Sequence, residues 1–234
     1  DEYDIQCGYE AGCLGYSLYN QLTAAGVKCV ILAPTTMLTP QGVRIKTDMR
    51  DAYMIAQCLS YGGYHAVYIP TEADDSVKEY LRMRNDHKLA LKKIKQQINA
   101  FCIRHGFCYD GTKWTLAHLN WLKKLEITNE LYRETLDEYM ASYEEQEAKI
   151  ERYDKRIEEI AEQTKYYDKV KKLKCFLGIK THTALSLIVE NGDFERFAKG
   201  NQYASYLGLA PGENSSSDSI HRLGITKAGN SHLG

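Results

Sequence analysis

Near the start of the chain, the hydrophobic and polar positions alternate between strand-like and helix-like patterns. Residues 4–9 are extended in character, and residues 27–33 form a continuous apolar run of the kind found in buried parallel strands. A helical pattern follows each of them, at residues 16–25 and at residues 48–59. A third short strand is predicted over residues 65–69. This alternation predicts an α/β layer.

Long helical patterns occupy the middle of the chain. Apolar residues recur at helical spacing over residues 76–106, and a second series recurs at alternating steps of three and four. That second series is a heptad seam of about four repeats. Its members are Leu136, Tyr139, Tyr143, Gln146, Ile150, Tyr153, Ile157, Ile160 and Thr164. We therefore predict a long hairpin arm or a dimerising coiled coil, and one edge of a helical bundle is the alternative.

The pattern changes again toward the end of the chain. Residues 177–184 resemble the turn of a helix–hairpin–helix, where backbone N–H groups at a helix start can hold a phosphate. A glycine between two packed helices is the simpler alternative. Residues 207–234 are rich in glycine and serine but keep apolar positions that a disordered tail would usually lose. Three histidines are interpreted as loop or surface residues: His182, His221 and His232.

Composition narrows the class of protein. The 234 residues are 44% hydrophobic and 26% charged, as in soluble globular proteins, and the net charge of −1 means that nucleic-acid binding would need local basic patches. Seven cysteines without a CxxC pair indicate reduced thiols in a cytosol. No apolar run approaches the roughly 20 residues of a membrane helix. We predict an α/β plus α fold with an α/β domain at 1–75, a helical region at 76–170 and a small, mostly helical domain at 171–234.

Three acidic residues are candidates for a metal site. Glu10 follows the first predicted strand, and Asp48 and Asp51 lie three positions apart in the first turn of a predicted helix that Thr47 could cap. Residues at this spacing share a face, with Cβ atoms roughly 5–6 Å apart. Mg²⁺ prefers oxygen ligands that converge from separate elements, a geometry used in phosphodiester chemistry. The alternative is that the aspartates complement the helix dipole and that Glu10 is a solvated strand-end residue.

Five blocks of sequence occur in an order that resembles one family. They are YEAGCLGYSLYNQL, KTDMRDAYMIA, FLGIKTHTALSLI, FERF followed by YASYLGLAP, and GITKAGN. Together they resemble the insertion-sequence transposases of the IS110 group, with IS116 and IS902, which are relatives of the Piv invertase. The resemblance spans nearly the whole chain.

The resemblance implies a RuvC-like, ribonuclease-H-type domain with a DEDD set of acids, a coiled-coil arm and a C-terminal domain that contributes a nucleophilic serine. By position, Glu10 matches the second acid, and Asp48 and Asp51 match the last two. The first acid is expected on a strand that precedes Glu10, so we expect the chain to be trimmed at both ends and inactive as it stands. Aligned from the GLxP motif, Ser216 takes the nucleophile position, and Ser215 is the runner-up.

The function implied is that of a DNA transposase or site-specific recombinase, in which carboxylate-bound Mg²⁺ and Ser216 act on the same phosphate. DNA contacts are expected from Lys180, Thr181, Arg222 and Lys227. The family also implies a structured guide RNA. The heptad arm and the need to bring two duplexes together predict a homo-oligomer, and the cysteine pattern with the lack of a long apolar run predicts a cytoplasmic location without a membrane. Two alternatives stay open: a RuvC-like nuclease or junction resolvase that uses water, and an inactive DNA-binding remnant.

Overall fold

The computed structural model describes residues 5–34, 37, 47–213, 221–226, 229–230 and 232–233. The chain divides into two compact units, Asp1–Thr71 and Glu72–Gly234. Within the described residues helices predominate, and each unit has one short sheet of two strands. These features agree with the predicted combination of an α/β part with a helical part. The second unit contains both predicted later domains, and the boundary between those two domains stays a prediction.

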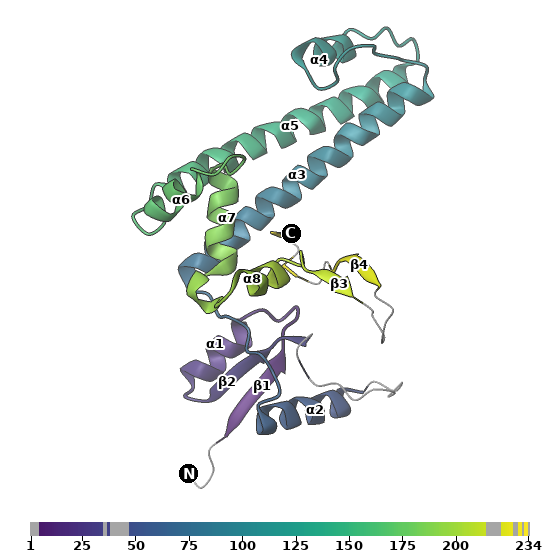
Figure 1. Ribbon diagram of the computed structural model, residues 1–234. Helices are drawn as coiled ribbons and strands as arrows, with labels where there is room; N and C mark the ends of the chain where they lie inside the picture. Colours follow the sequence, from purple (N-terminus) through teal and green to yellow (C-terminus); the bar gives the residue numbers. More distant parts are fainter. Residues whose placement is uncertain are drawn as a thin grey trace. The chain divides into compact units, whose positions relative to one another are not determined.

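The first unit is built on two parallel strands, β1 (Gln6–Glu10) and β2 (Lys28–Leu32), joined by the helix α1 (Ser17–Ala24) (Figure 1). Their register places Glu10 opposite Leu32. Parallel strands need a crossover connection, which α1 supplies. The two predicted strands and the helix between them are confirmed.

A second helix, α2 (Asp48–Tyr61), completes the first unit. It begins where the Thr47 hydroxyl accepts a hydrogen bond from the backbone N–H of Arg50 at 3.4 Å. It ends at Gly62, whose φ of +68° is a left-handed conformation that favours glycine and lets its N–H bond the carbonyl of Cys58. The predicted helix and its N-cap are therefore confirmed.

The predicted strand at residues 65–69 is wrong in extent. Of these five residues, Ala66 alone is paired, in an isolated antiparallel bridge to Leu32. Two backbone hydrogen bonds to β2 and the residue after it flank this bridge, at 2.8 and 3.1 Å. The segment runs directly into Pro70, which has no N–H and cannot extend a ladder. The apolar run therefore forms one isolated bridge to β2 and no strand.

The second unit begins with a long antiparallel hairpin of two helices, α3 (Glu72–Arg104) and α5 (Glu130–Ala161), with the short helix α4 (Leu116–Lys123) between them in sequence and at the closed end (Figure 1). Ion pairs link the long helices, among them Arg84 with Asp154 and Lys95 with Glu147. Arg84 holds Asp154 through two hydrogen bonds of 2.7 and 3.0 Å. In the part of the chain that the structure describes, no helix is long and apolar enough to cross a membrane.

The heptad seam of α5 faces α3. Leu136, Tyr143, Ile150 and Ile157 follow one another at steps of seven, and each is at most 6% exposed. They pack in clusters with residues of α3 such as Ile98, which is fully buried. The predicted hairpin is therefore present, because apolar residues at this spacing form one stripe that a second helix covers. Its assembly into an intermolecular coiled coil stays a prediction.

The rest of the second unit packs against the base of this hairpin. It contains three helices, a 3-10 turn and two antiparallel strands: α6 (Tyr167–Leu173), α7 (Thr181–Asn191), Phe194–Arg196, α8 (Gly200–Tyr206), β3 (Pro211–Glu213) and β4 (Arg222–Ile225). The helix α7 contacts α3, α5 and α6. Its fully buried Ala184 and Leu185 share a core cluster with Leu81 of α3 and Ile157 of α5. The glycine- and serine-rich end of the chain thus includes ordered strands.

Candidate functional site

Glu10 lies at the carboxyl end of β1, the edge of the sheet where ligands of open α/β layers usually bind. The next residue, Ala11, donates its N–H to the carbonyl of Leu32 at 2.9 Å, which fixes the backbone just beyond the strand. The Glu10 side chain is half-buried. The backbone that carries the Glu10 carboxylate is therefore fixed at the sheet edge.

Asp48 and Asp51 occupy the first turn of α2, as predicted. The face of α2 that packs in the apolar cluster of the first unit includes Ile55 and Cys58, which lie four and seven positions after Asp51. Residues at these spacings share a helix face, so Asp51 continues that face beyond its apolar part. Asp51 is half-buried, whereas Asp48 is exposed. The two carboxylates are presented on the sheet-facing side of the helix and at its positively polarised end.

Gly8 sets how closely α2 approaches the sheet. A methyl group at this position would lie 2.9 Å from Cδ1 of Leu32 and 3.0 Å from Cδ1 of Leu59. Leu32 is fully buried, so it has little room to move. The absence of a side chain at Gly8 thus lets the helix that carries the aspartates lie directly on β1.

We expect Gly8→Ala to destabilise the first unit by about 1–3 kcal/mol, because overpacking a filled core displaces side chains or backbone. Hydrogen exchange of the β2 amides, followed by mass spectrometry, measures the change. Gly12→Ala is the matched control, since the nearest atom to its added methyl is a carbonyl oxygen 3.9 Å away. Equal exchange rates in the two variants would show that Gly8 does not control the approach of α2.

The described residues hold no ready-made metal cluster. No group of three or more His, Cys, Asp or Glu side chains among them is placed to hold a metal ion. Glu10, Asp48 and Asp51 therefore belong to the same unit without being drawn around one point. The predicted Ser216, its alternative Ser215 and the predicted DNA contact Lys227 lie outside the described residues.

The two strands β3 and β4 flank the segment that contains the serines. They form an antiparallel ladder in which Pro211 pairs with Ile225 and Glu213 pairs with Arg222. The predicted DNA contact Arg222 is exposed on β4. The next residue after β4, Thr226, donates its N–H to the carbonyl of Ala210 at 3.0 Å. The backbone on both sides of the serine segment is thus tied together.

A buried polar network anchors the end of the chain, and the sequence patterns did not predict it. Glu190 of α7, whose side chain is 5% exposed, accepts two hydrogen bonds from Arg82 of α3, at 2.8 and 2.9 Å. It also accepts one from the Asn230 amide at 2.9 Å. The Tyr206 hydroxyl donates to the Glu190 carbonyl at 2.9 Å and accepts from Asn230 at 3.2 Å. We call these four residues the Glu190 network.

Charge pairing decides the protonation of this network. Burial raises the pKa of the Glu190 carboxyl, but the hydrogen bonds from Arg82 and Asn230 outweigh it and hold the pKa below its ordinary value. Glu190 is therefore ionised and paired near neutral pH. Its three side-chain partners lie on elements far apart in sequence, so no local spacing reveals them.

Gly229 and Asn230, the last two residues of the GITKAGN block, pack against the C-terminal end of α8. A methyl group at Gly229 would lie 2.1 Å from the backbone nitrogen of Gly208 and 2.3 Å from the carbonyl carbon of Leu207, so glycine is required there. The Asn230 N–H donates to the carbonyl of Tyr206 at 2.8 Å. This block therefore has a structural role in addition to any chemical one.

The turn between α6 and α7 contains the predicted contacts Lys180 and Thr181. Lys180 is the exposed N-cap residue of α7. Thr181 is 3% exposed, so it could meet a nucleic acid through its backbone N–H but not through its side chain. The interpretation of His182 as a loop or surface residue is wrong. It lies in α7, and its buried Nε2 has no hydrogen-bond partner among the described residues.

The assignment of His182 to a loop or the surface is wrong because α7, in which it lies, packs against α3 and α5. Burial lowers the pKa of the imidazole, and the nearby Arg84 lowers it further, while Asp154 opposes the change. The neutral imidazole is therefore favoured, and the side chain is half-buried with its Nε2 enclosed. Its polar type alone suggested the surface, whereas the tertiary packing of α7 against the hairpin decides its burial.

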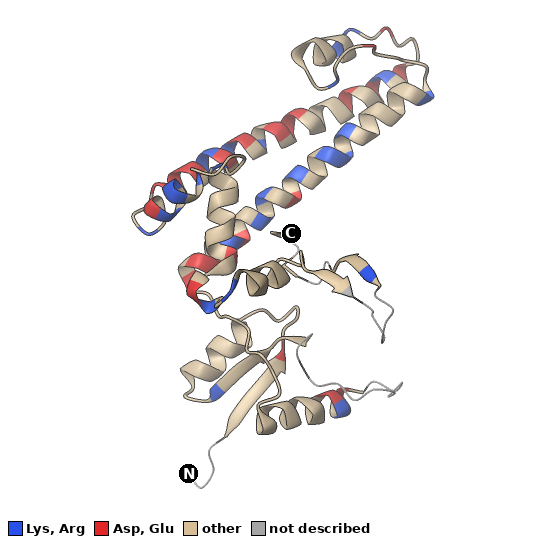
Figure 2. Ribbon diagram, viewed as in Figure 1, with Lys and Arg blue, Asp and Glu red and all other residues tan. Residues whose placement is uncertain are grey.

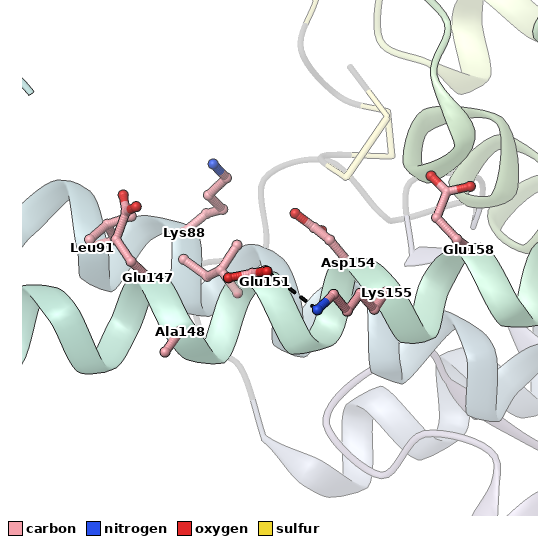
Figure 3. Close-up of a pocket in the computed structure, with 9 residues that line it drawn as sticks. Lys88, Leu91, Glu147, Ala148, Glu151, Asp154, Lys155 and Glu158 are labelled. Carbon is pink, nitrogen blue, oxygen red and sulfur yellow. Dashed lines mark ion pairs between the residues drawn. The ribbon is translucent and has the colours of Figure 1, made fainter. Parts of the chain in front are cut away.

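The hairpin surface separates charge along its two helices: basic residues predominate on the middle of α3 and acidic residues on α5 (Figure 2). A shallow groove of about 580 Å³ runs between them (Figure 3). Four acids and two lysines line it, and Lys155 pairs with Glu151 at 3.4 Å. The acids in the groove are Glu147, Glu151, Asp154 and Glu158. Phosphates would be repelled there, so this groove is not a nucleic-acid site.

Comparison with known proteins shows that part of the second unit is similar to a described family. Residues 170–233 match the model described as "Transposase IS116/IS110/IS902 family". The comparisons support this family for the chain. The matched segment contains the last four residues of α6, all of α7 and α8, both strands of the second sheet and three of the four residues of the Glu190 network. The fourth, Arg82, belongs to the hairpin.

Individual relatives named as transposases are similar to the chain over both units. The chain is 37% identical over 201 residues to the "Transposase for insertion sequence element IS1533" of Leptospira borgpetersenii, which covers 84% of this chain and 58% of that protein. It is 33% identical over 226 residues to the protein y4qE of Sinorhizobium fredii, covering 96% of this chain and 55% of that protein. The chain thus spans a little over half the length of these relatives.

Proposed function

We propose that this chain acts in DNA transposition or site-specific recombination as a transposase of an insertion sequence. The observation that carries the proposal is the similarity of 37% identity over both units to a protein named as a transposase, together with the family match of residues 170–233. Because the chain spans a little over half of that relative, the activity proposed is that of the whole protein. Two features of the fold support the proposal. Glu10 lies at the end of a strand and the two aspartates lie at the start of a helix of the same unit, and the strands β3 and β4 pair on either side of the serine segment.

In the proposed chemistry, Glu10, Asp48 and Asp51 hold Mg²⁺. Their donor set fits this ion, since all three supply hard carboxylate oxygens. They also come from one unit, with Glu10 at the carboxyl end of β1 and the aspartates on the sheet-facing side of α2. When bound, Mg²⁺ supplies charge neutralisation at the scissile phosphate. The chain's own part is to carry the three carboxylates on one unit, with α2 held against β1 at Gly8; a bound ion would have to draw them closer than they lie here.

The proposed nucleophile is Ser216, within the segment between β3 and β4. Its Oγ forms a bond to phosphorus, the bond from phosphorus to the leaving sugar oxygen breaks, and the hydroxyl proton passes to a base while the leaving oxygen takes up a proton. The resulting phosphoserine keeps one phosphate ester bond for later rejoining, which a recombinase needs and a simple nuclease does not. The ladder between β3 and β4 supports this role because it ties down both ends of the serine segment.

The proposed partners are DNA, a guide RNA and further copies of the protein. Lys180 and Arg222 are exposed on the second unit, where they are available to phosphates, and Lys227 is proposed to join them. The basic face of α3 and the acidic face of α5 have opposite charge, which supports association between hairpins of two copies.

The test is a search for covalent protein–DNA adducts formed by the full-length protein with DNA of the element's ends and Mg²⁺. Ser216→Ala is expected to abolish the adduct, because alanine has no hydroxyl to attack phosphorus. Ser215→Ala is the matched control, one residue away. Loss of the adduct only in the Ser215 variant would move the nucleophile by one position. Strand cleavage by the wild type without any adduct would instead indicate a nuclease that uses water.

A further inference from the structure

The turn between α6 and α7 exposes two large apolar side chains side by side in sequence. Phe176 is 65% exposed and Leu177 is fully exposed, and we call this pair the 176–177 tip. Their neighbours Leu173 and Ile179 pack against the core cluster of the second unit. The packing of Leu173 and Ile179 therefore fixes both ends of the turn, and the 176–177 tip between them is exposed to solvent.

The surroundings of the tip are strongly basic. Residues 169–180 contain five lysines and no acidic residue, a local charge of +5 in a chain whose net charge is −1. All five lysines are exposed: Lys169, Lys171, Lys172, Lys174 and Lys180. Lysines on α6 appear in blue in Figure 2. This positive charge favours a polyanionic partner over an uncharged, apolar protein surface.

A nucleic acid combines the two properties that the turn presents. Its phosphates attract lysines, and its bases offer flat apolar faces once they are unstacked. Proteins that bend DNA insert Phe, Leu or similar wedges between base steps, and unstacking costs a few kcal/mol per step. Stacking of an aromatic side chain on a base returns about 1–3 kcal/mol. One aromatic and one aliphatic residue, next to each other and flanked in sequence by exposed lysines, match this arrangement.

We propose that the 176–177 tip is a wedge that enters a DNA base step while the lysines of residues 169–180 hold the flanking phosphates. The inference rests on the proposed function only in taking DNA as the partner. It assigns to this turn a task distinct from phosphodiester chemistry: opening or holding open the duplex next to the strands that are exchanged. The first turn of α7, whose N-cap Lys180 makes no capping hydrogen bond with its side chain, adds backbone N–H groups beside the same lysines.

The experiment uses this full chain with DNA duplexes that contain a 2-aminopurine, in EDTA so that no strand is cut. Fluorescence anisotropy measures binding, and 2-aminopurine fluorescence measures unstacking. With wild type, we expect binding accompanied by a several-fold rise in 2-aminopurine signal. The double variant Phe176→Ala with Leu177→Ala should keep its affinity within about tenfold, given one lost stacking contact, and lose the rise in signal. Lys171→Gln with Lys174→Gln should instead weaken binding and reduce the salt slope by about 0.9 for each lost phosphate contact.

Matched controls come from the hairpin. Leu116→Ala removes an apolar side chain that is 76% exposed, and Lys123→Gln removes an exposed lysine, both away from the turn. Neither should change binding or unstacking. A full 2-aminopurine response in the double alanine variant would overturn the wedge, as would tight binding of wild type without any response. Binding to vesicles of anionic lipid but not to DNA, or self-association lost in the double variant, would also overturn it in favour of a membrane or a second copy.

This outcome is separate from that of the proposed function. A chain that unstacks DNA through the tip, while the full-length protein forms no serine adduct, keeps the wedge and removes the recombinase chemistry. Adduct formation without unstacking does the reverse.

Discussion

Replacing Asp48 by Asn in the full-length protein is expected to lower the rate of DNA strand cleavage at least about a hundredfold, because a lost metal ligand removes several kcal/mol of charge stabilisation in the transition state. Folding should be preserved, since Asp48 is exposed and an Asn in the first turn leaves the Thr47 cap intact. Asp51→Asn should have the same effect on cleavage. Gel assays of end cleavage against Mg²⁺ concentration, with circular dichroism of the same samples, measure both quantities.

The alternative reading of these aspartates makes a different prediction. If they only complement the dipole of α2, each substitution should cost about 0.3–1 kcal/mol of stability and leave cleavage unchanged. Glu130→Gln is the control, because Glu130 is an exposed acid in the first turn of α5. Normal cleavage by both aspartate variants would remove Glu10, Asp48 and Asp51 from the proposed metal site.

Replacing Arg82 by Ala is expected to lower the free energy of unfolding of the second unit by about 3 kcal/mol, the size of effect seen when one partner of a buried ion pair is removed. The carboxylate of Glu190 would stay buried with Asn230 as its remaining side-chain donor in the Glu190 network. Urea unfolding followed by the fluorescence of Trp114 and Trp121, both in the second unit, measures the change.

The pH dependence of this loss has a definite sign. In the wild type the Glu190 pKa is held below its ordinary value, so pairing stabilises the fold above the pKa of the unfolded chain, and this stability is lost as the pH falls. Without Arg82, burial favours the protonated acid. The deficit should therefore be largest at pH 7 and shrink at pH 4. Arg156→Ala is the control, since its pair with Glu159 is more than half exposed on both sides and is worth at most about 1 kcal/mol. A deficit that does not change with pH would contradict this account.

Local signals in the sequence were sufficient for most elements. The continuous apolar run of β2, the Thr47 cap of α2 and the seven-residue spacing from Leu136 to Ile157 each depend on neighbours within one element, and each prediction is confirmed. The third strand failed because pairing depends on a partner strand, and Ala66 alone meets β2. Local pattern thus determines the element, while the extent of pairing depends on tertiary contacts.

The residues of the candidate site also fall into those that local pattern predicts and those that only tertiary contacts reveal. The positions of Glu10, Asp48 and Asp51 on a strand end and a helix start follow from local pattern and the family resemblance. The Glu190 network does not, because Arg82 and Glu190 are 108 positions apart and no periodicity connects them. His182 was misplaced for a related reason: its burial comes from the packing of α7 against the hairpin. Long-range polar contacts leave little trace in one sequence.

The antiparallel pairing of α3 and α5 means that the chain leaves and re-enters the base of the second unit at almost the same place. With a rise of 1.5 Å per residue, each long helix spans about 50 Å. Removing or adding matched heptads in both helices would shift the α4 end by about 10 Å per heptad without disturbing the base. The hairpin can therefore serve as a molecular ruler, whose reach evolution or design can tune independently of the chemistry.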